Sequence, residues 1–160
     1  MTGDGFERER KFLVAQPDVA LAGAEGAVIA QGYLDNAQGL SVRVRLVPGR
    51  GRFMLTVKGP RRGMTRREAE CPIEPDVAEL LYAACGPHVI DKTRYPVSAD
   101  DGREWVVDVF HALNDGLVMA EVELGPEDAA PAVPAWCGPE VTDDDRYYND
   151  HLAHHPFTTW

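Results

Sequence analysis

The chain has 160 residues, a length typical of one domain, and we expect a single domain over residues 1–160. A net charge of −10 argues against a nucleic-acid-binding protein, which would be basic overall. No apolar run approaches the ~18 residues of a membrane span and the charged N-terminus is not a secretory signal, so the sequence predicts a cytoplasmic protein with no membrane partner.

Alternation of apolar and polar residues dominates the chain, and a period of two residues is typical of strands. In chain order, the predicted strands are Phe6–Ala15, Ala27–Leu34, Ser41–Val47, Arg52–Gly59, Thr65–Ile73, Val89–Val97, Glu104–Phe110 and Leu117–Leu124. Turn signals such as Pro48-Gly49 and Asp100-Asp101-Gly102 separate them.

The sequence predicts three helices between or after these strands. A short helix follows Pro17, and another covers Tyr147–His154 in the tail. The best defined is Glu74–Cys85, which has Pro75 in its first turn, an apolar face and Gly86 as a stop. Eight strands with a few helices indicate the α+β class, with a mostly antiparallel sheet or barrel.

Charged residues follow the same alternation, since residues i and i+2 of a strand share one face. Arg43 and Arg45 oppose Val44, for example, and Glu121 and Glu123 oppose Val122. The ordinary explanation of such a pattern is a solvated sheet face. Like charges at i and i+2 repel, however, so a face selected only for solubility would mix the two signs.

A barrel closed from these strands would enclose seven acidic and seven basic side chains. The acids are Glu7, Glu9, Glu68, Glu70, Asp108, Glu121 and Glu123, and the bases are Lys11, Arg43, Arg45, Lys58, Arg66, Lys92 and Arg94. Such an interior needs both anionic and cationic ligands to neutralise its side chains. A triphosphate would bind the Arg and Lys residues, and divalent metal ions would bind the carboxylates and bridge them to phosphate oxygens.

The first strand also carries a recognisable motif. Glu7-Arg8-Glu9-Arg10-Lys11 resembles the Glu-x-Glu-x-Lys signature of the CYTH superfamily, also called triphosphate tunnel metalloenzymes. Further blocks resemble the family in the same order: 31–34, 42–45, 55–59, 66–70, 92–95, 107–110, 120–124 and the tail from 140 to 157. The resemblance covers nearly the whole chain and is greatest to the short prokaryotic inorganic triphosphatases. It implies an eight-stranded antiparallel β-barrel, with a few helices packed outside, that holds a triphosphate with Mg²⁺ or Mn²⁺.

The predicted reaction is hydrolysis of tripolyphosphate to phosphate and pyrophosphate, by a metal-oriented water that Lys92 or a carboxylate such as Glu9 assists. We expect metal ions to bind Glu7, Glu9, Asp108, Glu121 and Glu123, with Glu68 and Glu70 beside them or at a second metal site. We expect phosphate oxygens to bind Lys11, Arg43, Arg45, Lys58, Arg66, Lys92 and Arg94. The competing interpretations are a salt bridge from Glu7 or Glu9 to Arg43 or Lys92, and a register shift at Arg66.

Several aromatic residues and histidines have plainer interpretations. Tyr33 and Tyr95 are expected in the core or at the barrel mouth rather than on the substrate. Trp105, Phe110 and Trp160 are expected to pack. The tail histidines His151, His154 and His155 are expected to be solvated on a surface helix, in preference to a metal cluster.

Two other functions remain open: a class IV adenylate cyclase and a non-catalytic polyphosphate sensor. No nucleotide-reading motif supports the cyclase, and a sensor would not need the acidic residues. The expected partner is tripolyphosphate or another small molecule that carries a triphosphate. Three cysteines without the spacing of a zinc site or a disulfide framework suit a reducing cytoplasm. A homodimer is one alternative for the oligomeric state, which the sequence does not determine.

Overall fold

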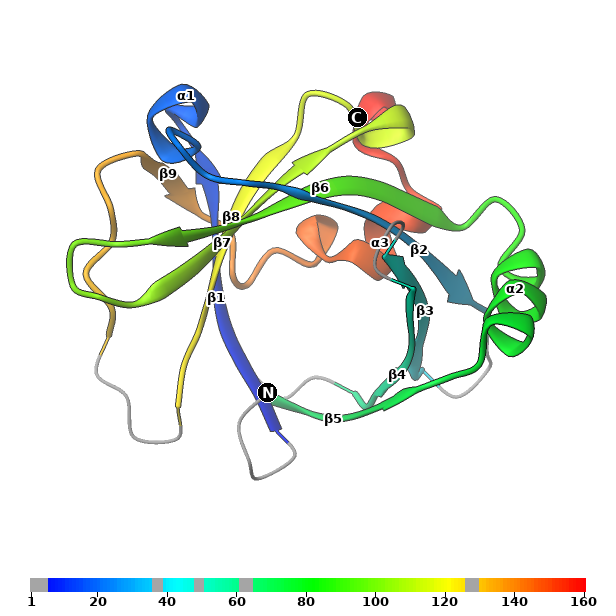
Figure 1. Ribbon diagram of the computed structural model, residues 1–160. Coiled ribbons are helices and arrows are strands. Elements are labelled where there is room, and N and C mark those ends of the chain that lie inside the picture. The colour runs from blue at the N-terminus through cyan, green and yellow to red at the C-terminus, as the bar shows by residue number, and fades with distance from the viewer. Residues whose placement is uncertain (1–5, 36–38, 48–50, 61–64, 126–129) are drawn as a thin grey trace.

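The computed structural model describes residues 6–35, 39–47, 51–60, 65–125 and 130–160 (Figure 1). The strands among them are β1 (Phe6–Val14), β2 (Ala27–Leu34), β3 (Ser41–Val47), β4 (Arg52–Lys58), β5 (Thr65–Pro72), β6 (Val89–Ser98), β7 (Glu104–Phe110), β8 (Val118–Glu123) and β9 (Cys137–Glu140). All eight predicted strands form, with ends within one residue of those expected. The short strand β9 was not predicted, and the turn at Pro48-Gly49 lies outside the described residues.

The helices are α1 (Pro17–Ala20), α2 (Pro75–Ala84) and α3 (Asn149–His154), together with three 3-10 turns, η1 (Ala112–Asn114), η2 (Asp145–Tyr147) and η3 (Phe157–Thr159). The three predicted helices are therefore present. None of the helices in the described ranges is long and apolar enough to cross a membrane.

The strands form a closed antiparallel barrel. They pair in the order β5-β4-β3-β2-β6-β7-β8-β1-β9, and β1 pairs with β5 as well, which closes the ring seen in Figure 1. The first strand changes partner along its length: residues 6–8 pair with β5, whereas Phe12 and Val14 pair with β9. The predicted eight-stranded barrel is confirmed, with β9 as an extra strand at its edge.

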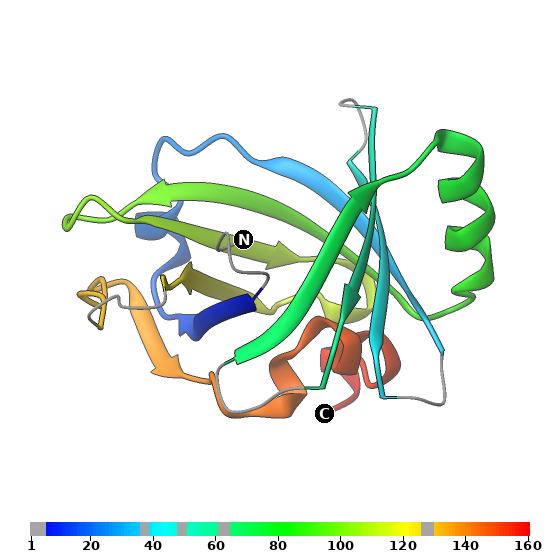
Figure 2. The same ribbon diagram turned by 90° about the horizontal axis from the view of Figure 1, so that it is seen from below.

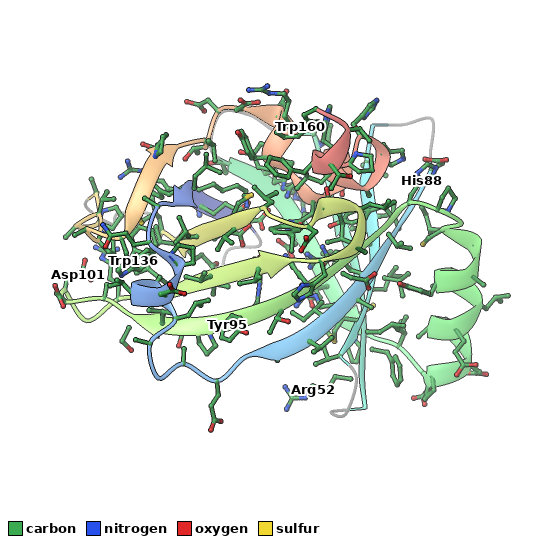
Figure 3. All side chains as sticks on the ribbon, turned by 90° about the horizontal axis from the view of Figure 1, so that it is seen from above. Arg52, His88, Tyr95, Asp101, Trp136 and Trp160 are labelled. Carbon is green, nitrogen blue, oxygen red and sulfur yellow. The ribbon has the colours of Figure 1, made fainter. Side chains whose placement is uncertain are left out.

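Two outer layers cover the barrel. Helix α2 packs on β2, β3 and β4, so closely that a Cβ on Gly32 would lie 2.6 Å from the Cys85 sulfur. Glycine is therefore required at this point of β2. On the opposite side, α1 and β9 cover a core around the fully buried Trp105, whose ring lies 5.7 Å from that of Trp136 (Figure 3). Tyr95 packs against this outer core, outside the barrel.

Helix α3 closes one end of the barrel. The inward face of β6, β7 and β8 changes from charged to apolar two positions further along each strand. Ile90, Phe110 and Met119 occupy these apolar positions and are buried. Leu152 of α3 is 0% exposed and packs on them, so α3 lies against this end (Figures 1 and 2). The expectation of a surface helix is wrong for this face of α3, because the barrel end offers an apolar surface that the tail covers.

Candidate active site

A cavity of about 290 Å³ lies inside the barrel, above the end that α3 closes. Twelve of the fourteen predicted charged residues line it: Glu7, Glu9, Lys11, Arg43, Arg45, Lys58, Arg66, Glu68, Glu70, Arg94, Glu121 and Glu123. Alternation along the strands is the reason, because each of these residues occupies the inward face of its strand. The structure thus brings together residues from six strands, and only Lys92 and Asp108 of the predicted set do not line the cavity.

Lys11 links two carboxylates of adjacent strands. Its Nζ lies 3.0 Å from Glu9 Oε1 and also donates to Glu121, and the side chain is 2% exposed. Burial would lower the pKa of Lys11, but Glu121 and Glu9 raise it above its usual value. The lysine is therefore a fixed positive charge that holds both carboxylates at the cavity wall.

Glu7 lies at the seam between β1 and β5. It accepts hydrogen bonds from Lys58 Nζ at 2.5 Å and from Arg66 Nε at 2.7 Å. Burial would raise the pKa of Glu7, but these two cations lower it to about 2. The register places Arg66 directly opposite Glu7, and Arg67 is exposed, so the predicted register of β5 is the one observed.

Asp108 and Lys92 lie beneath the cavity wall and are 0% and 1% exposed. Asp108 accepts from Arg94 through both oxygens, at 2.7 and 2.6 Å, and from Lys92 Nζ at 2.6 Å. Lys92 also donates to Asn149 at the start of α3, at 3.3 Å. Burial and the neighbouring Arg94 lower the pKa of Lys92 to about 8, although Asp108 opposes this. Because α3 covers this level of the barrel, neither side chain reaches the cavity.

We call the residues around Lys11 and Asp108 the paired wall: Glu9, Lys11, Lys92, Arg94, Asp108 and Glu121, on β1, β6, β7 and β8. Arg94 completes it by donating to Glu121 at 3.0 Å. Every charge in this wall has an opposite charge within 3.0 Å. A buried network of this kind is stable only as a unit, because removal of one member leaves a buried charge uncompensated.

The cations of β3, which we call the arginine wall, are different. Arg43 is 8% exposed, and its Nη2 donates to the Thr56 hydroxyl at 3.0 Å. Its Nε is buried without a hydrogen-bond partner, and no carboxylate of the described residues lies within ion-pair distance of it. Among the described residues, Arg45 has one carboxylate within ion-pair distance, that of Glu70 at 3.9 Å. Burial together with Arg43 lowers the pKa of Arg45 to about 10. A buried guanidinium group and a half-buried one with so little compensation are suited to an anionic ligand.

The tail contributes residues that strand alternation does not find. Tyr148, Asn149 and Asp150 line the cavity from the start of α3, and Lys11 Nζ lies 5.3 Å from the Tyr148 ring centre. The Tyr148 hydroxyl donates to the Thr142 carbonyl, which holds the ring in place. Their only signal in the sequence is that 146–149 is one of the blocks that resemble the family. Tyr33, expected in the core or at the mouth, is 4% exposed and also lines the cavity.

The carboxylates of β1 and β8 fit a divalent metal ion. Glu9 lies directly opposite Glu123 in the β1–β8 pairing, and Glu7 follows on the same face of β1. Like charges directly opposite each other in a sheet repel, so a divalent ion shared by these carboxylates would stabilise the pair. Carboxylate oxygens are the ligands that Mg²⁺ and Mn²⁺ prefer, so this donor set suits a hard cation.

Comparison with known proteins agrees with this geometry. The CYTH domain matches residues 5–148. An inorganic triphosphatase of Acetivibrio thermocellus is 42% identical over 154 residues, which cover 96% of each chain, and one of Nitrosomonas europaea is 39% identical over 150 residues, 92% of this chain and 96% of the relative.

Solved structures show the same architecture. The crystal structure of an inorganic triphosphatase superposes with a TM-score of 0.67 at 35% identity and covers 92% of this chain and 93% of its own. A putative adenylyl cyclase from Hippeastrum, described as having a dominant triphosphatase activity, has a TM-score of 0.58 at 14% identity over 74% of this chain and 79% of its own, and shares the fold alone. From its sequence, its barrel and its relatives, the chain belongs to the CYTH domain family.

Proposed function

We propose that this protein hydrolyses inorganic tripolyphosphate to phosphate and pyrophosphate inside the barrel, with Mg²⁺ or Mn²⁺. The observation that carries the proposal is the arginine wall, where the buried Nε of Arg43 has no hydrogen-bond partner among the described residues. An anion with several oxygens would supply the missing acceptors. The two relatives named inorganic triphosphatase, which align over almost the whole chain, support the same activity.

The substrate would lie between the arginine wall and the carboxylates of β1 and β8. Arg43 and Arg45 would each present a planar fork of N–H donors to phosphate oxygens. Lys58, Arg66 and Arg94 line the same cavity but are already bonded to carboxylates, so they would complete the grip with their remaining donors. The two arginines of β3 therefore do most of the binding in this proposal.

Glu7, Glu9 and Glu123 would hold the metal ions, with Glu121 beside them. When bound, a divalent ion neutralises charge on phosphate oxygens and lowers the pKa of a bound water. Glu9 faces the cavity and would orient the attacking water, while Lys11 keeps Glu9 and Glu121 in place. The general base remains unassigned in this scheme.

For the other predicted residues we propose supporting roles. Asp108 uses both oxygens on Arg94 and Lys92, so it positions those cations rather than binding metal. Lys92, beneath the wall, positions Asp108 rather than contacting the attacking water. Glu68, 3.2 Å from Lys58 Nζ, and Glu70 would orient the cations beside them.

The size and lining of the cavity favour an inorganic triphosphate over a nucleotide. A volume of about 290 Å³ is at the lower end of the ~300–1,000 Å³ typical of pockets for drug-sized ligands. Apart from two tyrosines and Val106, the described lining is polar or charged, so it offers little apolar surface to a base. Both features argue against the cyclase alternative.

Phosphate release from tripolyphosphate, ATP and pyrophosphate, each with Mg²⁺ or Mn²⁺, tests the proposal. We expect rapid release from tripolyphosphate and little from ATP, and Arg43→Met should lose most of this activity. Arg10→Met is the matched control, because Arg10 lies on the outer face of β1 and binds Glu140. Formation of cyclic AMP from ATP would contradict the proposal in favour of a cyclase, and binding of tripolyphosphate without turnover in favour of a sensor.

We also propose a cytoplasmic location and a small anionic partner rather than a nucleic acid. All three cysteines are free thiols, which a reducing compartment preserves. The net charge of −10 supports a ligand enclosed in a pocket over a long polyanion on the surface. Sedimentation velocity distinguishes a monomer from the homodimer alternative.

A further inference from the structure

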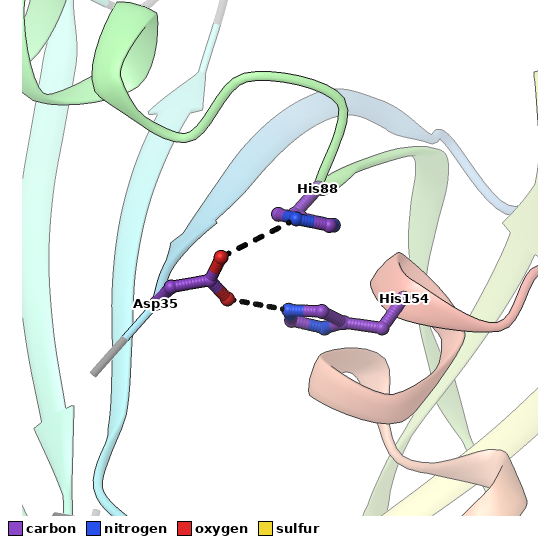
Figure 4. A group of neighbouring side chains, drawn as sticks. All are labelled: Asp35, His88 and His154. Atoms are coloured by element: carbon purple, nitrogen blue, oxygen red, sulfur yellow. Dashed lines mark hydrogen bonds and ion pairs between the residues drawn. The ribbon is translucent and has the colours of Figure 1, made fainter. Parts of the chain in front are cut away.

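A second cluster of metal-binding residue types lies outside the charged cavity (Figure 4). Asp35 follows β2, His88 precedes β6, and His154 is the last residue of α3. Asp35 Oδ1 lies 2.8 Å from His154 Nε2, and Asp35 Oδ2 lies 3.5 Å from His88 Nε2. The two imidazole rings stack with their centres 4.0 Å apart and an angle of 18° between their planes. Three segments distant in sequence therefore bring one carboxylate and two imidazole nitrogens together, with a different oxygen of Asp35 facing each histidine.

The hydrogen bonding of His154 defines which of its nitrogens carries the proton. Its Nδ1 lies 2.7 Å from the carbonyl oxygen of Asp150. A carbonyl only accepts, so Nδ1 carries a hydrogen, and a neutral His154 directs the Nε2 lone pair at the Asp35 carboxylate. At 2.8 Å such an arrangement is repulsive unless a cation lies between the two atoms. In metal sites, a ligating histidine typically donates its other N–H to a backbone carbonyl in this way.

A metal ion satisfies this cluster better than a proton does. One proton on His154 would leave the 3.5 Å contact of His88 without a good hydrogen bond, and two protons would stack two imidazolium rings. A metal ion about 2.0–2.2 Å from each donor requires donor atoms roughly 3.3 Å apart in a tetrahedral site. The two observed contacts bracket that spacing, and all three donors lie within 4.8 Å of one another.

Part of this cluster is held in position by the fold itself, before any metal ion binds. The His88 carbonyl accepts from the Tyr33 backbone N–H at 2.9 Å, which ties His88 to β2. Asp35, whose side chain is 71% exposed, is free to adjust to the ion. We propose that Asp35, His88 and His154 bind a transition-metal ion that prefers imidazole ligands, with Zn²⁺ as the type case and water in the remaining position.

This site differs in chemistry and in consequence from the charged cavity. The cavity offers oxygen donors suited to Mg²⁺ or Mn²⁺, whereas this cluster offers two imidazoles. The ion would tie the last residue of α3 to β2 and β6, while Asn149 and Asp150 at the start of α3 line the cavity. Metal binding would therefore stabilise α3 on the end of the barrel. The inference does not depend on the proposed function.

Zinc titration of the full chain at pH 7.5, in excess Mg²⁺ to occupy the carboxylate cavity, tests the proposal. We expect calorimetry to detect one Zn²⁺ site in the wild type, and the Tm to rise by roughly 5 °C when free Zn²⁺ is about 100 times Kd. His154→Ala and Asp35→Asn should weaken Zn²⁺ binding at least about tenfold. His151→Ala is the matched control, because His151 lies on α3 and stacks on His155 instead.

Nuclear magnetic resonance of the imidazole nitrogens supplies a readout that does not depend on stability. Zn²⁺ should shift Nε2 of His88 and His154 and leave His151 unchanged. Equal Zn²⁺ affinity in the wild type and in both His154→Ala and Asp35→Asn would overturn the proposal. So would a wild type that is indifferent to Zn²⁺ yet destabilised by His154→Ala, since the cluster would then hold a proton. Loss of binding in His151→Ala alone would place the site elsewhere and equally reject it.

Discussion

The paired wall and the arginine wall border the same cavity, but they differ in how far carboxylates neutralise their cations. Lys11 and Arg94 each bond Glu121, whereas Arg43 has no carboxylate within ion-pair distance among the described residues. A compensated buried charge contributes to the structure, but an uncompensated one costs free energy until an anion binds. The difference supports our proposal that phosphate binding is concentrated on β3 and that the cations of the paired wall chiefly hold carboxylates in position.

The largest effect is expected at Glu9, the residue of the paired wall that we propose as a metal ligand. Glu9→Gln keeps the shape of the side chain but removes the charge that would hold a divalent ion, so we expect kcat for tripolyphosphate to fall about 1,000-fold or more, roughly 4 kcal/mol. Steady-state phosphate release measures it. Binding of metal-free tripolyphosphate should be nearly unchanged, since the arginine wall is intact. Wild-type turnover in this variant would refute the metal assignment.

The next effect concerns stability alone. Asp108→Asn leaves Lys92 and Arg94 buried without their shared carboxylate, so we expect the free energy of unfolding to fall by about 3–5 kcal/mol. Urea denaturation at pH 7.5 measures this loss. A change below about 1 kcal/mol would mean that the paired wall is not a cooperative unit, and the contrast with β3 would disappear.

On the arginine wall, Arg43→Met is expected to have the opposite effect to Asp108→Asn: activity falls and stability does not. Methionine keeps much of the apolar length of the side chain but removes the uncompensated charge. We expect kcat/KM for tripolyphosphate to fall about 100-fold, roughly 3 kcal/mol, with no loss of stability in urea. A loss of stability as large as that of Asp108→Asn would show that Arg43 is a structural cation after all.

The smallest effect is expected outside the barrel, where Arg10 binds Glu140 of β9 through two hydrogen bonds at 2.9 and 2.6 Å. The bond from Arg10 lowers the pKa of Glu140, so the pair contributes stability above the ordinary pKa of a glutamate, and loses it as the pH falls below that value. Glu140→Gln should cost less than about 1 kcal/mol at pH 7, and this cost should shrink as the pH falls through the lowered pKa of Glu140. Thermal unfolding across this range, at low and high salt, measures both.

Strand alternation predicted the elements and their faces well, because a period of two residues is a local property. The face that Arg66 shares with Glu68 and Glu70 followed from the same reasoning, whereas the pairing of Arg66 with Glu7 did not. The level of each side chain along the barrel axis could not be predicted from alternation. Lys92 shares a face with Arg94, yet it lies beneath the cavity because α3 covers that level.

The strand β9 and the side-chain cluster that three separate segments form together were also not predicted from the sequence. The strand β9 is four residues long and contains Gly138 and Pro139, so it has no alternation to detect. The cluster of Asp35, His88 and His154 forms only because α3 returns to the barrel end, which no local pattern encodes. Side chains from three elements meet there through tertiary packing alone.

The partner change along β1 has a consequence for synthesis of the protein. The strand with the first-strand signature is made first, yet its partners β8 and β9 are among the last strands to be made. Lys11 therefore waits for more than a hundred residues of chain before Glu121 exists, whereas the partners of Glu7 on β4 and β5 are made earlier, and such non-local pairing slows folding. During translation the edge of β1 that pairs with β8 stays unpaired, so the barrel closes only after β8 has been made.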